Sequence, residues 1–241
     1  MGAFRRRIVI AHEGGPRRGT ARAALEDDFH HFRAAVDHEF EQVLHVEGSA
    51  LRNPYTLCPS AAGPLNGLVG MRLDRIASSV ARVTEASLQC THLFDLAGLA
   101  IATAAMQRPR RQYDIEVPDR VNGRTQAKLW ANGDLLLDWQ LDGLVIAGPN
   151  VSLREGFSRW ALQTLSPDEA EAAIVLRRCA MISLGRQKNL DIQIHAMPTG
   201  HCHVQQPERA ALALRIVGST WDFSERAAVL CADDEKWLAF G

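Results

Sequence analysis

The sequence predicts an α+β protein, in which antiparallel strands pack with several helices. Residues 20–51 and 124–147 alternate apolar and polar positions with the two-residue period of a half-buried strand. Residues 91–107 and 166–184 instead carry apolar side chains at helical spacing. Tight turns join the expected strands, which favours antiparallel pairing. The 241 residues are enough for a single compact unit with a buried core.

The first strands are predicted near the N-terminus. We expect residues 1–17 to be loosely ordered, with one short strand at residues 8–10 that ends before Gly14-Gly15-Pro16. A longer strand begins at residue 20, turns at residues 37–39 and returns over residues 40–51.

Helices are predicted after this hairpin. Asn53-Pro54-Tyr55 ends the return strand, because proline cannot donate to a ladder. Residues 72–86 place apolar side chains on one side and predict a helix. Residues 91–107 predict a second helix with a continuous apolar stripe.

The second half of the chain repeats the order of hairpin and helix. Asn132-Gly133 and Asp142-Gly143 are strong hairpin signals. Ser166-Pro167-Asp168-Glu169 combines an N-cap, a proline at the first helical position and a capping-box glutamate. The other expected elements are strands at 124–130, 135–141, 144–147 and 192–196 and a helix at 207–214. The repeated order suggests two similar halves, residues 18–110 and 111–241.

The composition argues against several classes of protein. The net charge of −1 offers no basic excess for nucleic acid. No apolar run reaches the length of a membrane span, and the N-terminus lacks the apolar core of a secretory signal. The five cysteines are odd in number and irregularly spaced. We therefore expect a cytoplasmic protein with reduced thiols.

A thiol, an imidazole and a carboxylate lie at the expected start of the helix at residue 91. Cys90 stands where unpaired backbone N–H groups and the helix dipole favour an anion. His92 and Asp95 are three residues apart and share a helix face, as an acid–base pair or a metal ligand with its orienting carboxylate would. The structural alternative is that Cys90 or Thr91 caps the helix and His92 satisfies a carbonyl.

A second acid–base segment spans residues 27–32. If this segment is a strand, Asp28, His30 and Phe32 share one side, and Asp27, Phe29 and His31 share the other. Each side then offers a carboxylate, an imidazole and an aromatic wall, which suits proton transfer on a small aromatic substrate. The alternative is a hairpin edge whose polar residues face water.

Two loops complete the candidate site. Arg52 can bind a carboxylate or phenolate through two parallel hydrogen bonds, and Tyr55 can act as a general acid. Cys58 lies in a loop framed by prolines, where a side chain can be held in one direction. His201-Cys202-His203 precedes another helix start, although at most two of these neighbours can face one metal ion. Gln205 is a candidate substrate contact.

These segments resemble a known family. Residues 27–32, 53–61, 68–70 and 90–93 are together similar to a bacterial family catalogued only as a domain of unknown function, over about residues 20–107. A fainter resemblance is to iron–sulfur scaffold proteins, in which Cys58 and Cys90 would stand where two cluster ligands stand. The first scaffold cysteine has no counterpart near residues 20–25. The longer chains also resemble proteins of soil bacteria that degrade plant aromatics.

Three functions are compatible with these residues. The first is a cofactor-independent lyase on a small aromatic catabolic intermediate, such as a retro-aldol loss of a one-carbon unit. Its expected residues are Asp28 with His30 or His31 as the base, Tyr55 or His92 as the acid, and Arg52, Phe32 and Gln205 as substrate contacts. The second is a zinc or scaffold-like protein with ligands among Cys58, Cys90, His92, Cys202 and His203. The third is a non-catalytic module that binds a small molecule. The sequence is also compatible with a homodimer.

Overall fold

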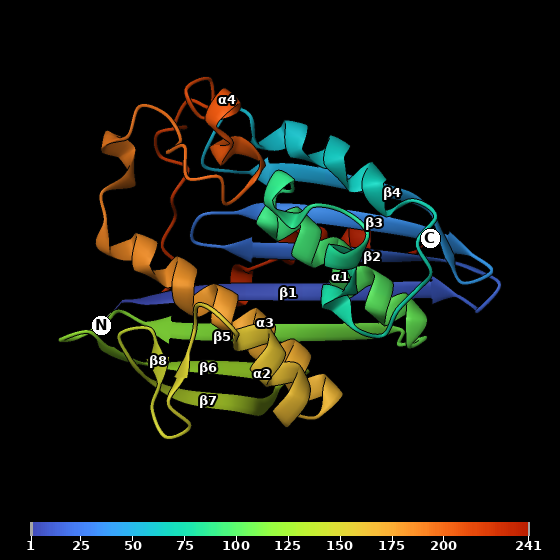
Figure 1. Cartoon of the computed structure of the whole chain (residues 1–241), viewed down its shortest axis with the longest axis horizontal. Helices are drawn as coiled ribbons and strands as arrows, with labels where there is room; N and C mark the ends of the chain where they lie inside the picture. The colour runs from blue at the N-terminus through green and yellow to red at the C-terminus, as the bar shows by residue number, and fades with distance from the viewer. Residues whose placement is uncertain (1, 241) are drawn as a thin grey trace. The chain divides into compact units, whose positions relative to one another are not determined.

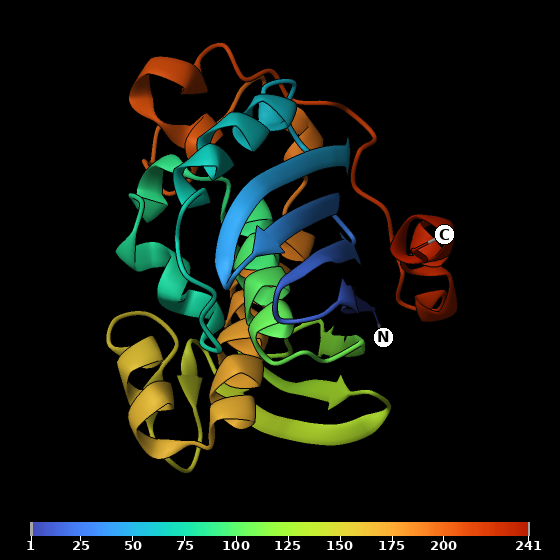
Figure 2. The ribbon, with the colours of Figure 1, turned by 90° about the vertical axis from the view of Figure 1, so that its right-hand side faces the viewer.

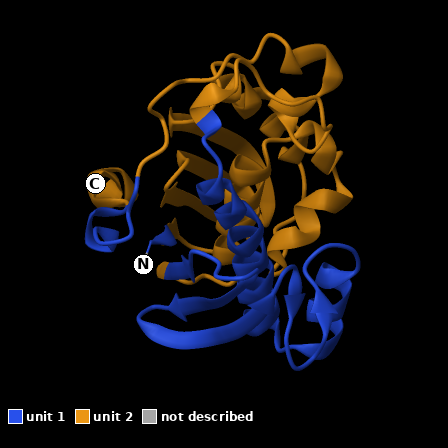
Figure 3. Cartoon of the chain, turned by 90° about the vertical axis from the view of Figure 1, so that its left-hand side faces the viewer, with its two compact units in different colours: residues 1–7, 112–190, 222–230 blue, residues 8–111, 191–221, 231–241 orange. Residues whose placement is uncertain are grey.

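The computed structural model describes residues 2–240, and its contacts divide the chain into two compact units (Figure 3). Unit 1 comprises residues 1–7, 112–190 and 222–230, and unit 2 comprises residues 8–111, 191–221 and 231–241. Each unit therefore combines three separated stretches of the chain. Both units contain strands and helices, and the predicted α+β class is confirmed (Figure 1).

Unit 2 is built on an antiparallel sheet with a helix on one face. Its strands are hydrogen-bonded in the order β4-β3-β2-β1, with bounds Ala3–Gly14 for β1, Arg18–Asp27 for β2, His31–Glu39 for β3 and Gln42–Arg52 for β4. Strand β1 begins in unit 1 and continues into unit 2. Helix α1 (Thr91–Ala105) packs against β2 and β3, and the strands curve around it (Figure 2). A C-terminal segment with helix α5 (Glu235–Leu238) packs on the other face.

Helix α1 is apolar on nearly every side because it is enclosed on nearly every side. All of its residues from Leu96 to Ala104 are buried. Gly98 is required here, since a Cβ would run into the backbone oxygen of Ala77. The predicted helix at 91–107 is confirmed to within two residues. None of the helices between residues 2 and 240 has the length and apolar content that a membrane crossing requires.

The predicted helix over residues 72–86 is wrong. Two 3₁₀ turns lie there instead, η2 (Ala77–Arg82) and η3 (Ala86–Leu88), and a longer 3₁₀ segment, η1 (Cys58–Leu68), precedes the region. The expected apolar face does not exist as a buried stripe, because Val80 is buried whereas Ile76 and Val83 are 37% and 49% exposed. Apolar spacing alone therefore misassigned a segment that packs against α1 through the 3₁₀ turn η2.

Unit 1 contains the predicted meander and its helices. The bounds are Arg110–Pro118 for β5, Arg124–Ala131 for β6, Asp134–Asp142 for β7, Val145–Ile146 for β8, Val151–Ser152 for β9, Phe157–Thr164 for α2 and Pro167–Ile182 for α3. Asn132 and Gly133 both have positive φ, as the expected two-residue hairpin turn requires. The capping box is present, with Ser166 and Glu169 each accepting from the other's backbone N–H. Helix α3 packs on β6 and β7.

Four predictions at element ends are also wrong. Residues 1–17 are not loosely ordered, because β1 extends over twelve of them and its Arg7 pairs with Asp114 at 2.6 Å. The turn that was expected at residues 37–39 lies at Phe40-Glu41, between β3 and β4. Residues 192–196 form only a single bridge, between His195 and Leu214. The helix predicted at 207–214 ends early, and α4 spans Pro207–Ala210.

Two buried imidazoles meet across the sheet of unit 2. His12 of β1 and His38 of β3 are stacked with their Nε2 atoms 3.1 Å apart. Gly19 of β2 lies between them and is paired with His38 in the strand register. A Cβ at Gly19 would stand 2.7 Å and 2.8 Å from the two Nε2 atoms, so only glycine leaves room for the contact. One ring therefore donates a hydrogen bond to the other, which requires an uncharged acceptor.

We expect this pair to make the protein less stable in acid. Burial lowers the pKa of both His12 and His38. The neighbouring His38 lowers the pKa of His12 further, whereas the charge of Asp37 acts to raise the pKa of His38. The folded protein thus binds fewer protons than the unfolded chain below the ordinary value of 6.5. The free energy of unfolding should fall as the pH is lowered through about 6.5, as urea titrations at several pH values will measure.

The matched control for this pH dependence is an exposed histidine. His45→Gln should leave the loss of stability between pH 7.5 and pH 5.5 unchanged, because the His45 side chain is 61% exposed. Replacing both His12 and His38 by glutamine should flatten the profile. An equally steep acid loss in that double variant would contradict the assignment.

Candidate functional site

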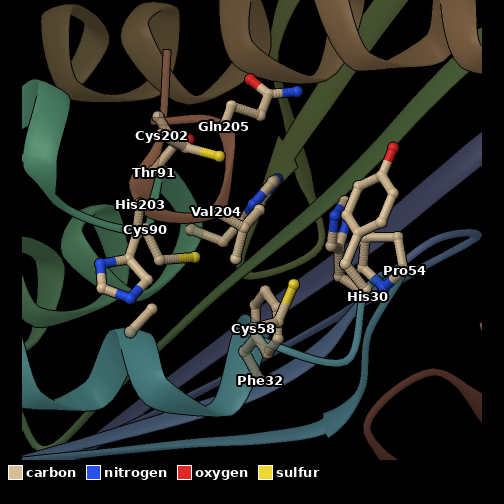
Figure 4. A pocket seen from close by; sticks show the side chains of 13 residues that line it. His30, Phe32, Pro54, Cys58, Cys90, Thr91, Cys202, His203, Val204 and Gln205 are labelled. Carbon is tan, nitrogen blue, oxygen red and sulfur yellow. The ribbon is translucent and has the colours of Figure 1, made fainter. Parts of the chain in front are cut away.

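The candidate site is a cavity of about 160 Å³ within unit 2 (Figure 4). It is enclosed by the start of α1, the turn between β2 and β3, the loop after β4 and the 3₁₀ turn η6 (His203–Gln205). The residues that line it are His30, Phe32, Pro54, Tyr55, Cys58, Ala61, Cys90, Thr91, His92, Cys202, His203, Val204 and Gln205. Four separated segments of the sequence therefore meet at one site.

The turn between β2 and β3 fixes the position of His30. The Asp27 carboxylate accepts hydrogen bonds from the backbone N–H groups of Phe29 at 2.7 Å and His30 at 2.8 Å. The same oxygen lies 3.1 Å from Nδ1 of His30. With Nδ1 as the donor to this fully buried carboxylate, Nε2 carries the lone pair. Asp27 and His30 form an acid–base dyad of the kind that fixes the tautomer of a general base.

Arg52 holds this turn in place from behind. Its guanidinium donates to four backbone carbonyls, those of Asp27 at 2.5 Å, Asp28 at 3.1 Å, His30 at 3.3 Å and Ser219 at 3.0 Å. It also lies 4.3 Å above the ring of Trp221 and 3.4 Å from the Glu26 carboxylate. Arg52 does not line the cavity, and its donors are already engaged by the protein itself.

His92 lies in the first turn of α1, against His30. Cys90 is the N-cap residue, in an extended conformation that directs the helix start toward the cavity. The rings of His92 and His30 stack with centroids 3.9 Å apart, and Phe32 lies 5.4 Å from His30 and 5.8 Å from His92. Two imidazoles and one aromatic ring thus form one wall of the cavity, beside the dyad.

The three thiols of the cavity are held in their protonated form. Burial raises the pKa of Cys90 to about 12, although backbone N–H groups at the helix start act in the opposite direction. Burial, followed by the neighbouring Cys90, raises the pKa of Cys58 far above its usual range. Burial also raises the pKa of Cys202. Since the thiolate is the nucleophile, these cysteines are poorly suited to nucleophilic catalysis at neutral pH.

Tyr55 and His203 bring further polar groups to the cavity. The Tyr55 hydroxyl donates to Oε1 of Gln193 at 2.8 Å, and burial raises its pKa despite the nearby Arg215, so the phenol keeps its proton. His203 lies 2.9 Å from the Ser60 hydroxyl through Nε2, and burial lowers its pKa. Tyr55 is therefore a proton donor, whereas His203 is an uncharged imidazole.

The structure brings most of the predicted site residues together. His30, Phe32, Tyr55, Cys58, Cys90, His92, Cys202, His203 and Gln205 all line the cavity. Asp28, His31 and Arg52 do not. His31 instead contacts Asp234 at 2.9 Å, on a carboxylate that also accepts from Arg33 at 2.5 Å. Asp28 is fully buried behind the turn.

Sequence reasoning missed Asp27 as the partner of His30. A continuous strand over residues 27–32 is wrong, because β2 ends at Asp27 and β3 begins at His31. The alternation of sides therefore fails between these residues. The spacing of an aspartate two and three residues before the backbone groups it caps is a turn signal that could have identified it.

One segment of the chain is similar to a known family. The fold and the cavity define an α+β protein with a histidine-rich buried site. Residues 17–107 match the model of the family described as "Protein of unknown function (DUF2889)", which confirms the predicted resemblance to a domain of unknown function over this segment. No curated protein matches the chain, and no solved structure matches it. The likeness to iron–sulfur scaffolds stays a prediction.

Proposed function

We propose that unit 2 is an enzyme that performs acid–base chemistry, of the lyase type, on a small aromatic substrate. The observation that carries the proposal is the Asp27–His30 dyad at the wall of the cavity, with Nδ1 of His30 3.1 Å from the carboxylate. Carboxylate-oriented imidazoles are the commonest general bases in enzymes. No cofactor is needed for the proposed step.

The size and lining of the cavity support an aromatic substrate. Its volume of about 160 Å³ is close to that of a cavity of about 150 Å³ that takes up benzene in another protein. Phe32, Pro54 and Val204 supply apolar walls, and the polar groups converge from His30, His92 and Tyr55. One aromatic ring with a short side chain fits this arrangement.

The proposed step is the loss of a one-carbon aldehyde from a primary alcohol. Nε2 of His30 removes the hydroxyl proton of the substrate, and the C–C bond next to the resulting alkoxide breaks to release the aldehyde. The electron pair of that bond forms a C=C bond to the neighbouring benzylic carbon, and the bond from this benzylic carbon to its ether or hydroxyl oxygen breaks. Tyr55 or His92 donates a proton to this oxygen, so atoms and charge balance. The expected roles of Tyr55 and His92 are thereby kept, whereas Arg52 and His31 serve the turn and the sheet.

A shared cavity favours this proposal over a non-catalytic module. In such a module the polar motif residues would serve capping and core hydrogen bonds at separate places. Here His30, Tyr55 and His92 line one cavity. A stable binding role for the same cavity is still an outcome that the experiment below distinguishes.

The test uses the purified protein and a panel of phenolic compounds in which a hydroxymethyl group is attached next to a benzylic carbon that carries an ether or hydroxyl oxygen. We expect a subset to bind, seen as a rise in the thermal unfolding midpoint, and to release formaldehyde. Tyr55→Phe and His92→Gln should both retain binding, and the variant that removes the proton donor should lose release. His201→Gln is the matched control, because His201 is exposed and outside the cavity. Binding without release by the wild-type protein would favour the binding module, and neither binding nor release would refute the proposal for this substrate class.

A further inference from the structure

Three potential metal ligands converge at the wall of the cavity. Asp27, His30 and His92 each offer one ligand atom, and these atoms all lie within 4.8 Å of one another. They come from the turn after β2 and from the first turn of α1, two elements that pack against each other in unit 2. Asp27 is fully buried, and the His30 side chain is 11% exposed.

The distances fit a tetrahedral ion. Nδ1 of His30 lies 3.1 Å and 3.4 Å from the two oxygens of Asp27. Two ligands at about 2.0–2.1 Å from a tetrahedral zinc-like ion are separated by about 3.3–3.4 Å. Asp27 and His30 therefore already have the separation of two zinc ligands. For His92 to become the third ligand, its ring must move by about 1.5 Å or less.

The chemistry of the ligands selects a class of ion. Two imidazoles and one carboxylate suit a divalent transition metal, such as zinc, cobalt or iron. Magnesium and calcium prefer oxygen ligands, which this site supplies only through Asp27. His30 and His92 line the cavity, so a fourth position of the ion would face a bound molecule.

The thiols of the cavity do not form an equivalent site. Among residues 2–240, no other group of three or more histidine, cysteine or acidic residues has its ligand atoms within this spacing. Cys58, Cys90 and Cys202, expected as ligands in the sequence analysis, line the cavity without meeting at one point.

We propose that Asp27, His30 and His92 bind one divalent transition-metal ion at the wall of the cavity. An ion at this place takes the position of the proton between Asp27 and His30. It also uses a ring nitrogen of each histidine. A consequence that rests on the proposed function is that the ion inhibits the acid–base step, because neither imidazole then exchanges protons freely. Binding itself does not depend on that function.

The test is titration of the metal-free protein with Co²⁺, followed by calorimetry and by visible absorption. We expect about one ion per chain and the visible bands of a four- or five-coordinate nitrogen–oxygen site. A near-ultraviolet sulfur-to-cobalt charge-transfer band should be absent. Metal binding is measured without any turnover. A failure of the proposed enzymatic function therefore leaves the metal-binding result intact, and an absence of metal binding leaves the proposed function intact.

The variants locate the ion. His92→Gln and His30→Gln should each weaken Co²⁺ binding by about tenfold or more. His203→Gln is the matched control, because His203 lines the same cavity outside the group of three, and its affinity should not change. The proposal is overturned by an absence of Co²⁺ binding, by unchanged affinity in both ligand variants, or by a sulfur charge-transfer band that Cys58→Ser removes.

Discussion

His30→Gln is expected to lower turnover of any alcohol found to react by about 10²–10⁴-fold, the usual contribution of a positioned acid or base. Glutamine keeps a side-chain amide near the Asp27 carboxylate, so the turn should persist, but it cannot accept a proton. Michaelis constants should change far less than kcat, because in the proposed complex the substrate ring would pack against the apolar lining residues Phe32 and Val204. Steady-state kinetics with formaldehyde release as the readout will measure both.

Asp27→Asn separates orientation from proton transfer. The asparagine oxygen can still accept from the N–H groups of Phe29 and His30, as the carboxylate does at 2.7 Å and 2.8 Å. The negative charge beside Nδ1 of His30 is lost. We expect kcat to fall while far-ultraviolet circular dichroism and binding stay the same. Wild-type kcat in either variant would refute the role of the dyad.

Arg52→Met is expected to lower the free energy of unfolding by about 3–5 kcal/mol. The Arg52 side chain is 9% exposed, and its loss removes one donor from the Glu26 carboxylate and from each of four carbonyls. Methionine fills a similar volume against Trp221, so the cost comes from polar groups rather than from a cavity. Urea unfolding at pH 7 will measure it.

Two further arginine variants serve as controls for Arg52. Arg52→Lys keeps the charge but loses the planar fork, and it should recover only part of the stability. Arg72→Met removes an exposed pair with Glu41, in which the arginine side chain is 78% exposed, and it should have little effect. Equal effects of Arg52→Met and Arg72→Met would show that Arg52 does not hold the turn.

Local signals predicted the regular elements well. The capping box at Ser166 and the Asn132-Gly133 turn specify their structures through a few neighbouring residues, so they were readable without tertiary information. The length of strand β1 was underestimated for the opposite reason, because only residues 8–10 were expected to be extended. Its arginines resemble a solvated tail until the partners appear, such as Asp114 for Arg7 in unit 1.

The sequence predicted which residues lie at the cavity better than it predicted what each of them contacts. The segments around His30, Tyr55, His92 and His203 were each chosen for their chemistry, and the fold brings them to one cavity. Arg52 was expected to bind a substrate, but it binds backbone carbonyls, which no side-chain pattern reports. Asp27 was assigned to the wrong side because a turn of three residues interrupts the strand.

The cavity is assembled from both inside and outside the family segment. His30 and His92 lie within residues 17–107, whereas Cys202, His203, Val204 and Gln205 come from a later part of the chain. Relatives that share the first segment but differ after residue 190 would keep His30 and His92 and exchange part of the cavity wall. The family model therefore covers one part of the cavity lining, and the rest of the lining is specified by residues beyond it.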